Sequence, residues 1–192
     1  CNKAITVRVP RKPENYSARS YTTATALSSG WLWEIDLPTR TGAGYVFSSD
    51  HLSTEQAQLE MLSQLSLPSE PEDITCLDFK PGRRKDCWVN NCLSIGLSSG
   101  FIEPLEATSI QLIDIGLRLF YEYLPFFSEQ PEALRDRYNQ LMREQYDEAR
   151  DFVHLHYLLS RRTDSDFWLE ASNMNLSSDA LKAKLNLWQS KL

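Results

Sequence analysis

The stretch NNCLSIGLSSGFIEPLEATSIQLI, residues 90–113, runs from an apolar strand-like segment through small residues and two glutamates into a helical pattern. The strand is predicted to end at Gly96, and the small side chains that follow let another group approach the backbone closely. Thr108 and Ser109 come near the start of the helix, where backbone N–H groups and the helix dipole favour an anion. The same two residues can instead simply cap the helix.

Glu103 and Glu106 flank Pro104 in this stretch, among neighbours that are nearly all apolar or small. A carboxylate is costly to bury without a partner. Glu106 is therefore exposed, paired or functional, and the residues alone leave these alternatives open.

Toward the N-terminus, period-two alternation predicts four strands, at residues 3–9, 20–27, 31–37 and 44–48. The turns between the later strands are expected in SSG at 28–30 and TRTGAG at 39–44, which gives an antiparallel meander. GAGYVF at 42–47 is similar to the start of a dinucleotide-binding loop, but Phe47 stands where the third glycine belongs and no helix follows. We interpret it as a glycine turn between strands.

The segment WLWEI at residues 31–35 places Trp31, Trp33 and Ile35 on one face of its strand. Such a face is typical of a packed core. Two indoles separated by one residue can also form the wall of a pocket for a flat ring. Spacing does not choose between the two.

After these strands, Ser53 and Gln56 form the pattern of a capping box, and Pro68 is expected to end the helix that it opens. Two further strands are predicted, ITCLDF at 74–79 and CWVNNCLSIG at 87–96, with a turn at Pro81 and Gly82 between them.

Helical patterns fill the rest of the chain. TSIQLIDIGLRLFYEYL at 108–124 is apolar all round, which predicts a buried helix. A longer helix opens at Pro131, and its predicted inner face consists of Leu134, Tyr138, Leu141, Gln145, Ala149, Phe152 and His156. A short helix around Phe167 and Trp168 follows, and Ser178 is expected to cap the last one. The predicted fold class is α+β, an antiparallel sheet followed by a helical subdomain.

Composition and charge narrow the function classes. The net charge of −6 and the isoelectric point near 5.1 argue against a nucleic-acid partner. Because the sequence has neither an apolar run of membrane-spanning length nor a signal peptide, we expect a cytoplasmic protein without a membrane partner. The spacing of the cysteines and histidines predicts reduced thiols and no metal site. The chain starts within a strand pattern and stops within a helical one, so we expect a piece of a longer protein.

Two of these segments together carry a resemblance to a known family, the flavin-dependent tryptophan halogenases. WLWEI is similar to the family's WxWxIP signature, and EPLEATS at 103–109 is similar to its EPLEST[GS] segment. The resemblance extends over YTTATALSSGWLWEI at 21–35, TGAGYVFSS at 41–49 and WVNNCLSIGLSSGFIEPLEATSI at 88–110, and continues through RDFVHLHY and DSDFW near the end.

The resemblance implies an enzyme that uses FADH2, oxygen and chloride or bromide to halogenate an aromatic, indole-like or tryptophan-like substrate. In that family hypohalous acid passes along a tunnel to a lysine beside the substrate. By resemblance, Glu106 is the catalytic glutamate near that lysine, and the backbone of Thr108 and Ser109 holds the halide. The implied flavin-contacting residues are Leu97, Ser98, Ser99, Gly100 and Ile110, and the implied tunnel wall is Trp31, Trp33 and Ile35.

The resemblance also implies a division of one truncated, monooxygenase-like halogenase domain into three parts. These are a sheet part at 1–86, a strand, loop and helix at 87–128 that contact flavin and halide, and a helical subdomain at 129–192. A separate flavin reductase and a homodimer are the implied protein partners. The family's FAD phosphate loop and catalytic lysine match no segment here, so the chain alone is expected to be inactive.

Three residues depart from the family pattern. Asp36 stands at the proline of the tryptophan signature, which predicts a less rigid strand end. Ala107 replaces a serine proposed to link the flavin and substrate sites. Ser109 stands where many members have glycine, a change that a backbone halide site tolerates. Two other readings remain: a flavin monooxygenase on the same scaffold, and a binding module whose acidic helices at 131–160 contact a reductase or second subunit.

Overall fold

The structure is a computed structural model that describes residues 1–10, 18–67, 73–126 and 131–190. Its contacts divide the chain into two compact units. The first comprises Cys1–Lys80 with Arg161–Glu170, and the second comprises Pro81–Ser160 with Ala171–Leu192. Among the described residues, no helix is both long enough and apolar enough to span a membrane.

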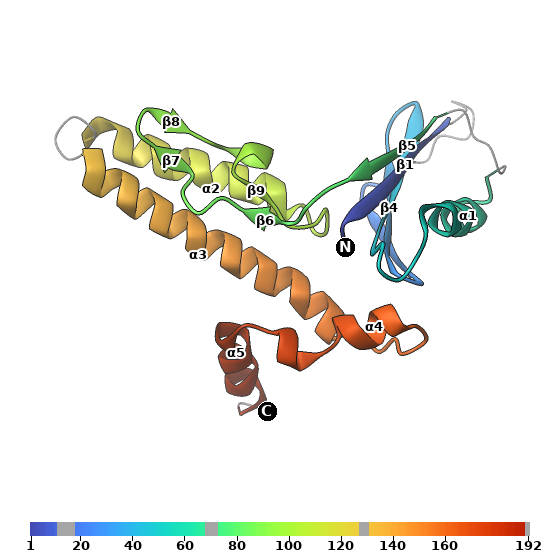
Figure 1. Cartoon of the computed structure of the whole chain (residues 1–192). Helices are drawn as coiled ribbons and strands as arrows, with labels where there is room; N and C mark the ends of the chain where they lie inside the picture. Colours follow the sequence, from blue (N-terminus) through green and yellow to red (C-terminus); the bar gives the residue numbers. More distant parts are fainter. Residues whose placement is uncertain (11–17, 68–72, 127–130, 191–192) are drawn as a thin grey trace. The chain divides into compact units, whose positions relative to one another are not determined.

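The first unit is built on a five-stranded sheet whose neighbouring strands all run antiparallel (Figure 1). The strands are β1 (Lys3–Pro10), β2 (Thr23–Leu27), β3 (Gly30–Asp36), β4 (Arg40–Phe47) and β5 (Ile74–Asp78). Their spatial order is β2-β3-β4-β1-β5, so β2 to β4 form the predicted meander and β1 lies between β4 and β5. The four strands expected from period-two alternation are present, but the fourth, β4, begins at Arg40 rather than at residue 44.

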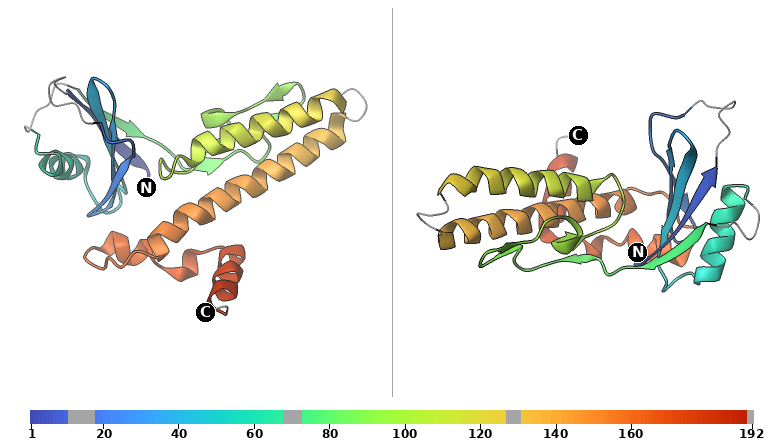
Figure 2. Two further views of the ribbon diagram at one scale, coloured as in Figure 1. Left: turned by 180° about the vertical axis from the view of Figure 1, so that it is seen from behind. Right: turned by 90° about the horizontal axis from the view of Figure 1, so that it is seen from above.

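One face of this sheet forms the core of the first unit against α1 (Thr54–Gln64), which lies alongside it (Figure 2). Leu32 of β3 and Tyr45 of β4 are opposite each other in the register and fully buried. Met61 of α1 is fully buried in the same cluster. Ala43, Tyr45 and Phe47 of β4 belong to the same cluster, so alternate side chains of this central strand face the core, as in a half-buried antiparallel sheet.

The start of α1 has the predicted capping box. Ser53 Oγ accepts a hydrogen bond from the Gln56 N–H at 3.2 Å, and the Gln56 side chain accepts one from the Ser53 N–H at 3.2 Å. The helix ends at Gln64, with Leu65 as its C-cap. Pro68, the predicted end, lies outside the described residues.

The predicted glycine turn at 39–44 is wrong. The turn occupies residues 37–39, and Gly42 and Gly44 lie inside β4. Trp33 pairs with Gly44 across the sheet, and a Cβ at Gly44 would lie 2.4 Å from the indole ring. Gly44 is therefore needed because the Trp33 ring lies on the backbone of β4, and a close approach of this kind explains a glycine inside a strand.

Residues 161–170 return to the first unit and include most of α4 (Asp166–Ala171), which confirms the predicted short helix. Trp168 is fully buried, and its indole N–H donates to the Leu27 carbonyl at 2.8 Å. Its ring also meets Trp31 edge-on, with centroids 5.2 Å apart. This segment therefore covers part of the β2–β3 hairpin.

The second unit begins with short strands. β6 (Gly82–Arg83) pairs with β9 (Gly100–Phe101), β7 (Trp88–Val89) pairs with β8 (Cys92–Leu93), and the 3-10 turn η2 (Gly96–Ser98) follows β8. The single strand predicted at 87–96 is therefore wrong. Asn90 has a left-handed backbone, with φ of 52°, and turns the chain into a hairpin.

Helices complete this unit: α2 (Thr108–Tyr123), the 3-10 turn η3 (Leu124–Phe126), α3 (Pro131–Leu158), the 3-10 turn η4 (Met174–Leu176) and α5 (Asp179–Gln189). α2 and α3 lie side by side (Figures 1 and 2). Their shared core contains Trp88, Leu112, Tyr138 and Met142. The α+β architecture, a sheet followed by helices, is thus confirmed.

The expectation that α2 is buried all round is wrong for the described part of the chain. Leu112 and Gly116 are buried, but Ile110, Leu117 and Tyr121 are at least half exposed. The exposed residues lie on the side of α2 that α3 does not cover. An apolar sequence pattern reports hydrophobicity, whereas burial depends on which neighbours are present.

The buried face of α3 is also displaced from the predicted one. Its buried apolar and aromatic residues are Tyr138, Met142, Tyr146, Val153 and Tyr157. Only Tyr138 belongs to both the predicted and the observed set. The other buried residues lie one position after predicted ones; Met142, Tyr146 and Tyr157, for example, follow Leu141, Gln145 and His156.

Ser178 caps α5 as predicted, accepting from the Leu181 N–H at 3.0 Å.

Candidate functional site

The segment that joins β9 to α2 has an unusual backbone. Glu106 and Ala107 both adopt left-handed conformations, with φ of 57° and 53°. For residues other than glycine this conformation costs roughly 1 to 2 kcal/mol each, so the surrounding structure must hold it. Leu105 and Thr108, on either side, are buried and supply that anchoring. The result is a tight turn that presents Glu106 just before α2 begins.

The two glutamates of this segment have opposite environments. Glu103 is 6% exposed and accepts a hydrogen bond from the Tyr157 hydroxyl of α3. Burial raises the pKa of Glu103 above its ordinary value, and the hydrogen bond from Tyr157 works in the opposite direction. Glu106, in contrast, has a side chain that is 56% exposed. Glu103 is therefore a structural carboxyl, and Glu106 is the one accessible to another molecule.

His156 of α3 is the neighbour of Glu106. Its Nε2 lies 3.8 Å from the Glu106 carboxylate, and its Nδ1 lies 2.9 Å from the Phe152 carbonyl. Because a carbonyl only accepts hydrogen bonds, Nδ1 carries the proton in this contact. The sequence pattern did not predict this contact. It predicted His156 on the inner face of α3, and the only chemical role considered for His156 was metal binding.

The predicted halide-binding residues occupy the first turn of α2. Thr108 Oγ1 donates to the Leu105 carbonyl at 3.4 Å and so is directed back into the loop. Any contact with an anion therefore falls to the backbone N–H groups of Thr108 and Ser109, and at Thr108 it would compete with a long bond from the same N–H to the Leu105 carbonyl, at 3.5 Å. They lie at the positive end of a 16-residue helix, which suits an anion.

The predicted flavin-contacting residues divide into two kinds. Leu97 of η2 and Ile110 of α2 are 77% and 69% exposed, which is unusual for large apolar side chains. η2 lies against α2, where Ile113 is in van der Waals reach of a Cβ at Gly96. Leu97 and Ile110 thus offer apolar surface on neighbouring elements, and such a surface fits the face of a flat ring.

The small residues between them are engaged inside the protein. Ser98 Oγ donates to the Ile95 carbonyl at 2.9 Å, and Ser99 Oγ lies 2.7 Å from the Tyr146 hydroxyl. A Cβ at Gly100 would lie 2.7 Å from the Tyr146 ring. Packing therefore accounts for the small side chains at 99 and 100, and their predicted contact with a cofactor could involve backbone atoms only.

Trp31, Trp33 and Ile35 belong to the first unit, on the sheet face opposite α1. Trp31 packs against Trp168, Trp33 covers Gly44, and Ile35 is 40% exposed. The core against α1 is instead formed by Leu32, the residue between the two indoles. The three side chains thus form a largely apolar, partly exposed row.

The contacts of Asp36 oppose the predicted loss of rigidity at the end of this strand. Asp36 accepts hydrogen bonds from the Arg19 backbone N–H at 2.9 Å and from its guanidinium at 3.1 Å. The Thr41 hydroxyl donates to it at 2.9 Å. The side chain is only 3% exposed, so these bonds hold the strand end in place of the signature proline.

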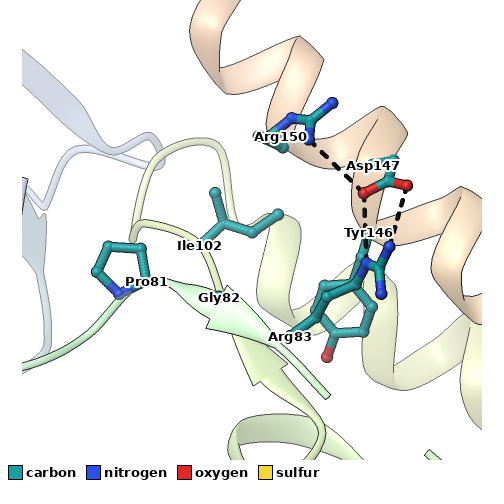
Figure 3. Close-up of a pocket in the computed structure, with 7 residues that line it drawn as sticks. All are labelled: Pro81, Gly82, Arg83, Ile102, Tyr146, Asp147 and Arg150. Atoms are coloured by element: carbon teal, nitrogen blue, oxygen red, sulfur yellow. Dashed lines mark hydrogen bonds and ion pairs between the residues drawn. The ribbon is translucent and has the colours of Figure 1, made fainter. Parts of the chain in front are cut away.

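A pocket of about 400 Å³ opens in the second unit (Figure 3). It is lined by Pro81, Gly82, Arg83, Ile102, Tyr146, Asp147 and Arg150. Arg83 donates twice to Asp147, at 3.3 and 3.2 Å, and Arg150 lies 3.8 Å from the same carboxylate. Because both cations already share an anion, the pocket does not present a strong charge to a ligand.

Comparisons with known proteins identify the family to which these features belong. The sequence profile described as "Tryptophan halogenase" matches residues 1–191. Tryptophan 7-halogenase RebH of Lentzea aerocolonigenes is 33% identical over 188 residues, covering 98% of this chain and 35% of RebH. Tryptophan 6-halogenase ThaL of Streptomyces albogriseolus is 32% identical over 192 residues, covering all of this chain and 36% of ThaL.

Solved structures agree. The tryptophan halogenase of Shewanella frigidimarina NCIMB 400 superposes with a TM-score of 0.92 at 35% identity, over 97% of this chain and 36% of that one. BrvH, a flavin-dependent halogenase of Brevundimonas sp. BAL3, superposes with a TM-score of 0.87 at 40% identity, over 98% and 37%. The chain spans about a third of the length of the curated relatives. With the profile matched along nearly the whole sequence and its fold shared with these structures, the chain belongs to the tryptophan halogenase family.

Proposed function

We propose that the enzyme to which this chain belongs is a flavin-dependent halogenase. It uses FADH2, oxygen and chloride or bromide to halogenate an aromatic substrate of the indole or tryptophan type. The observation that carries the proposal is the EPLEATS turn, where the exposed Glu106 stands directly before the N-terminus of α2. Membership of the tryptophan halogenase family supports it.

Each part of the turn has a proposed role. Bound FADH2 and oxygen supply the oxidation that makes the halide electrophilic. The backbone N–H groups of Thr108 and Ser109 hold the halide, and Leu97 and Ile110 contact the flavin ring, with Ser98, Ser99 and Gly100 beside it. Trp31, Trp33 and Ile35 line the path between flavin and substrate.

Glu106 is proposed to act on the substrate ring. When a halogen adds to an aromatic carbon, a C–halogen bond forms and the proton on that carbon must leave. An exposed carboxylate beside the ring can accept this proton and stabilise the positive charge that develops before it leaves. By the resemblance, Glu106 acts together with a catalytic lysine, and no segment of residues 1–192 matches the segment that carries it. The chain alone is therefore proposed to be inactive.

The proposal includes three further features of the enzyme. A separate flavin reductase supplies FADH2, the enzyme assembles as a homodimer, and it acts in the cytoplasm.

The decisive test is halide dependence. The full-length enzyme, supplied with a flavin reductase, FAD, NADH and oxygen, should convert tryptophan or a related indole into a product whose mass includes chlorine or bromine. Omission of both halides should abolish product. A hydroxylated product formed equally well without halide would reject the proposal in favour of a flavin monooxygenase.

A further inference from the structure

Two consecutive residues of α3 each contact one glutamate of the EPLEATS turn. The Tyr157 hydroxyl donates to Glu103, and His156 Nε2 lies 3.8 Å from Glu106. The two glutamates are three residues apart on the loop, while His156 and Tyr157 are adjacent on the helix. One end of α3 therefore contacts the turn at both of its acidic groups.

The orientation of the His156 ring is fixed independently of Glu106. Its Nδ1 is 2.9 Å from the Phe152 carbonyl one turn earlier in α3, and the Phe152 ring meets the imidazole edge-on with centroids 4.9 Å apart. With Nδ1 donating to the Phe152 carbonyl, Nε2 is the remaining polar atom. It faces the turn and attracts the Glu106 carboxylate when it also carries a proton, that is, in the imidazolium form. A ring held in this way can restrict the rotamers of a flexible glutamate.

We propose that His156 is a positioning residue for Glu106, holding its carboxylate toward the substrate while the Glu103–Tyr157 bond anchors the turn beneath it. This inference rests on the proposed function of Glu106. Without His156, the exposed Glu106 side chain would sample several rotamers, and only a fraction of them would direct the carboxylate toward the ring.

The test is a double-mutant cycle in the full-length enzyme, with His156→Phe and Glu106→Gln made singly and together. His156→Phe should lower the rate of halogenation about 10-fold, a coupling within the range found for residues in contact. Adding His156→Phe to Glu106→Gln should cause almost no further loss. The KM for the indole substrate and the rate of flavin reoxidation should stay within about 2-fold, the scatter expected of uncoupled sites.

Two more variants separate positioning from a purely structural role. His156→Gln can still direct an amide N–H at Glu106 and should lose less activity than His156→Phe. His154→Phe is the matched control, because it makes the same exchange two residues earlier. His154 Nε2 is buried without a hydrogen-bond partner among the described residues. Its replacement should leave halogenation per folded enzyme within about 2-fold.

Equal losses from His156→Phe with and without Glu106→Gln would overturn the proposal, as would a loss that only follows the folded fraction. If the single variant Glu106→Gln keeps full halogenation, the proposed function of Glu106 fails, and the positioning role fails with it. If Glu106→Gln is inactive but His156→Phe is fully active, only the positioning role is wrong.

Discussion

WLWEI in the first unit and EPLEATS in the second are held in place by different kinds of contact. In WLWEI, Trp33 lies over the backbone of Gly44 and Trp31 packs edge-on against Trp168. In EPLEATS, polar side chains of α3 contact both glutamates. Close apolar packing suits a fixed wall, whereas polar contacts suit a group whose charge and orientation matter. Changes in the first segment should therefore act mainly on stability, and changes at Glu106 should act mainly on rate.

The largest effect is expected from Glu106→Gln in the full-length enzyme. A group that acts as a base or charge partner in the transition state is worth about 10² to 10⁴ in rate, so halogenation should fall by that factor. Flavin reoxidation and the melting temperature should hardly change, because the side chain is more than half exposed. Product formation and flavin reoxidation are measured on the same preparation.

Glu122→Gln, an exposed glutamate near the other end of α2, is the control and should be fully active. Undiminished halogenation per folded Glu106→Gln enzyme would contradict the assignment and remove the contrast between the two segments.

Gly44→Ala should have the next largest effect, on stability. The added Cβ would lie 2.4 Å from the Trp33 ring, so the indole or the strand must move. Overpacking of this kind typically costs about 1 to 3 kcal/mol, and urea unfolding should show a loss in that range.

The neighbouring glycine of the same strand provides a control for this change. A Cβ at Gly42 would meet Trp33 at 3.8 Å, an ordinary contact, so Gly42→Ala should be nearly neutral. Equal losses at the two positions would show that strand backbone, rather than the Trp33 contact, requires glycine.

Tyr157→Phe should lower stability in a pH-dependent way. It removes a hydrogen bond to the buried Glu103, at a cost of about 1 to 2 kcal/mol. Because burial raises the folded-state pKa of Glu103 above its ordinary 4.5, the stability that its protonated form contributes is lost as pH rises through the folded pKa. Loss of the Tyr157 donor raises that pKa further. The destabilisation should therefore be smaller near pH 4.5 than at neutral pH.

Tyr138→Phe serves as the comparison, because the Tyr138 hydroxyl donates to the uncharged carbonyl of Gly116 at 3.2 Å. Its cost should not change over the same pH range. Parallel pH profiles for the two variants, measured by urea unfolding, would refute the role assigned to the Glu103 carboxyl.

The smallest effect is expected from Asp36→Asn. This change keeps the shape of a nearly buried side chain but weakens its charged bonds to Arg19, at a cost of about 1 kcal/mol. Glu34→Gln alters the other carboxylate near Arg19, at 3.3 Å and more exposed, and should cost less. Thermal unfolding measures both. A larger cost at Glu34 would mean that Asp36 does not hold the end of β3.

Local patterns were sufficient to predict much of the fold. Strand alternation, the Ser53 capping box and the Ser178 cap are set by residues within a few positions of each other. Local pattern does not explain the glycines of β4, because the need for Gly44 comes from Trp33 on the neighbouring strand β3. The hairpin at Asn90 was missed because two adjacent asparagines do not interrupt an apolar run strongly enough to separate a turn from a strand.

The candidate site was only partly predictable for the same reason. The start of α2 and the importance of Glu106 follow from sequence pattern and resemblance. The different environments of Glu103 and Glu106 do not, because they depend on Tyr157 and His156, about 50 residues further along the chain. The neighbouring residues in the sequence do not show which of the two glutamates is buried in the folded protein.

The return of residues 161–170 to the first unit has a consequence for the order of folding. The Trp168 and Arg162 side chains donate to the Leu27 carbonyl across 141 and 135 residues of sequence. During synthesis, the sheet of the first unit is made long before the residues that cover its β2–β3 hairpin. Closing so long a loop is slow compared with local steps. Until Trp168 arrives, Trp31 lacks this neighbour, and this apolar surface of the nascent chain stays open to aggregation.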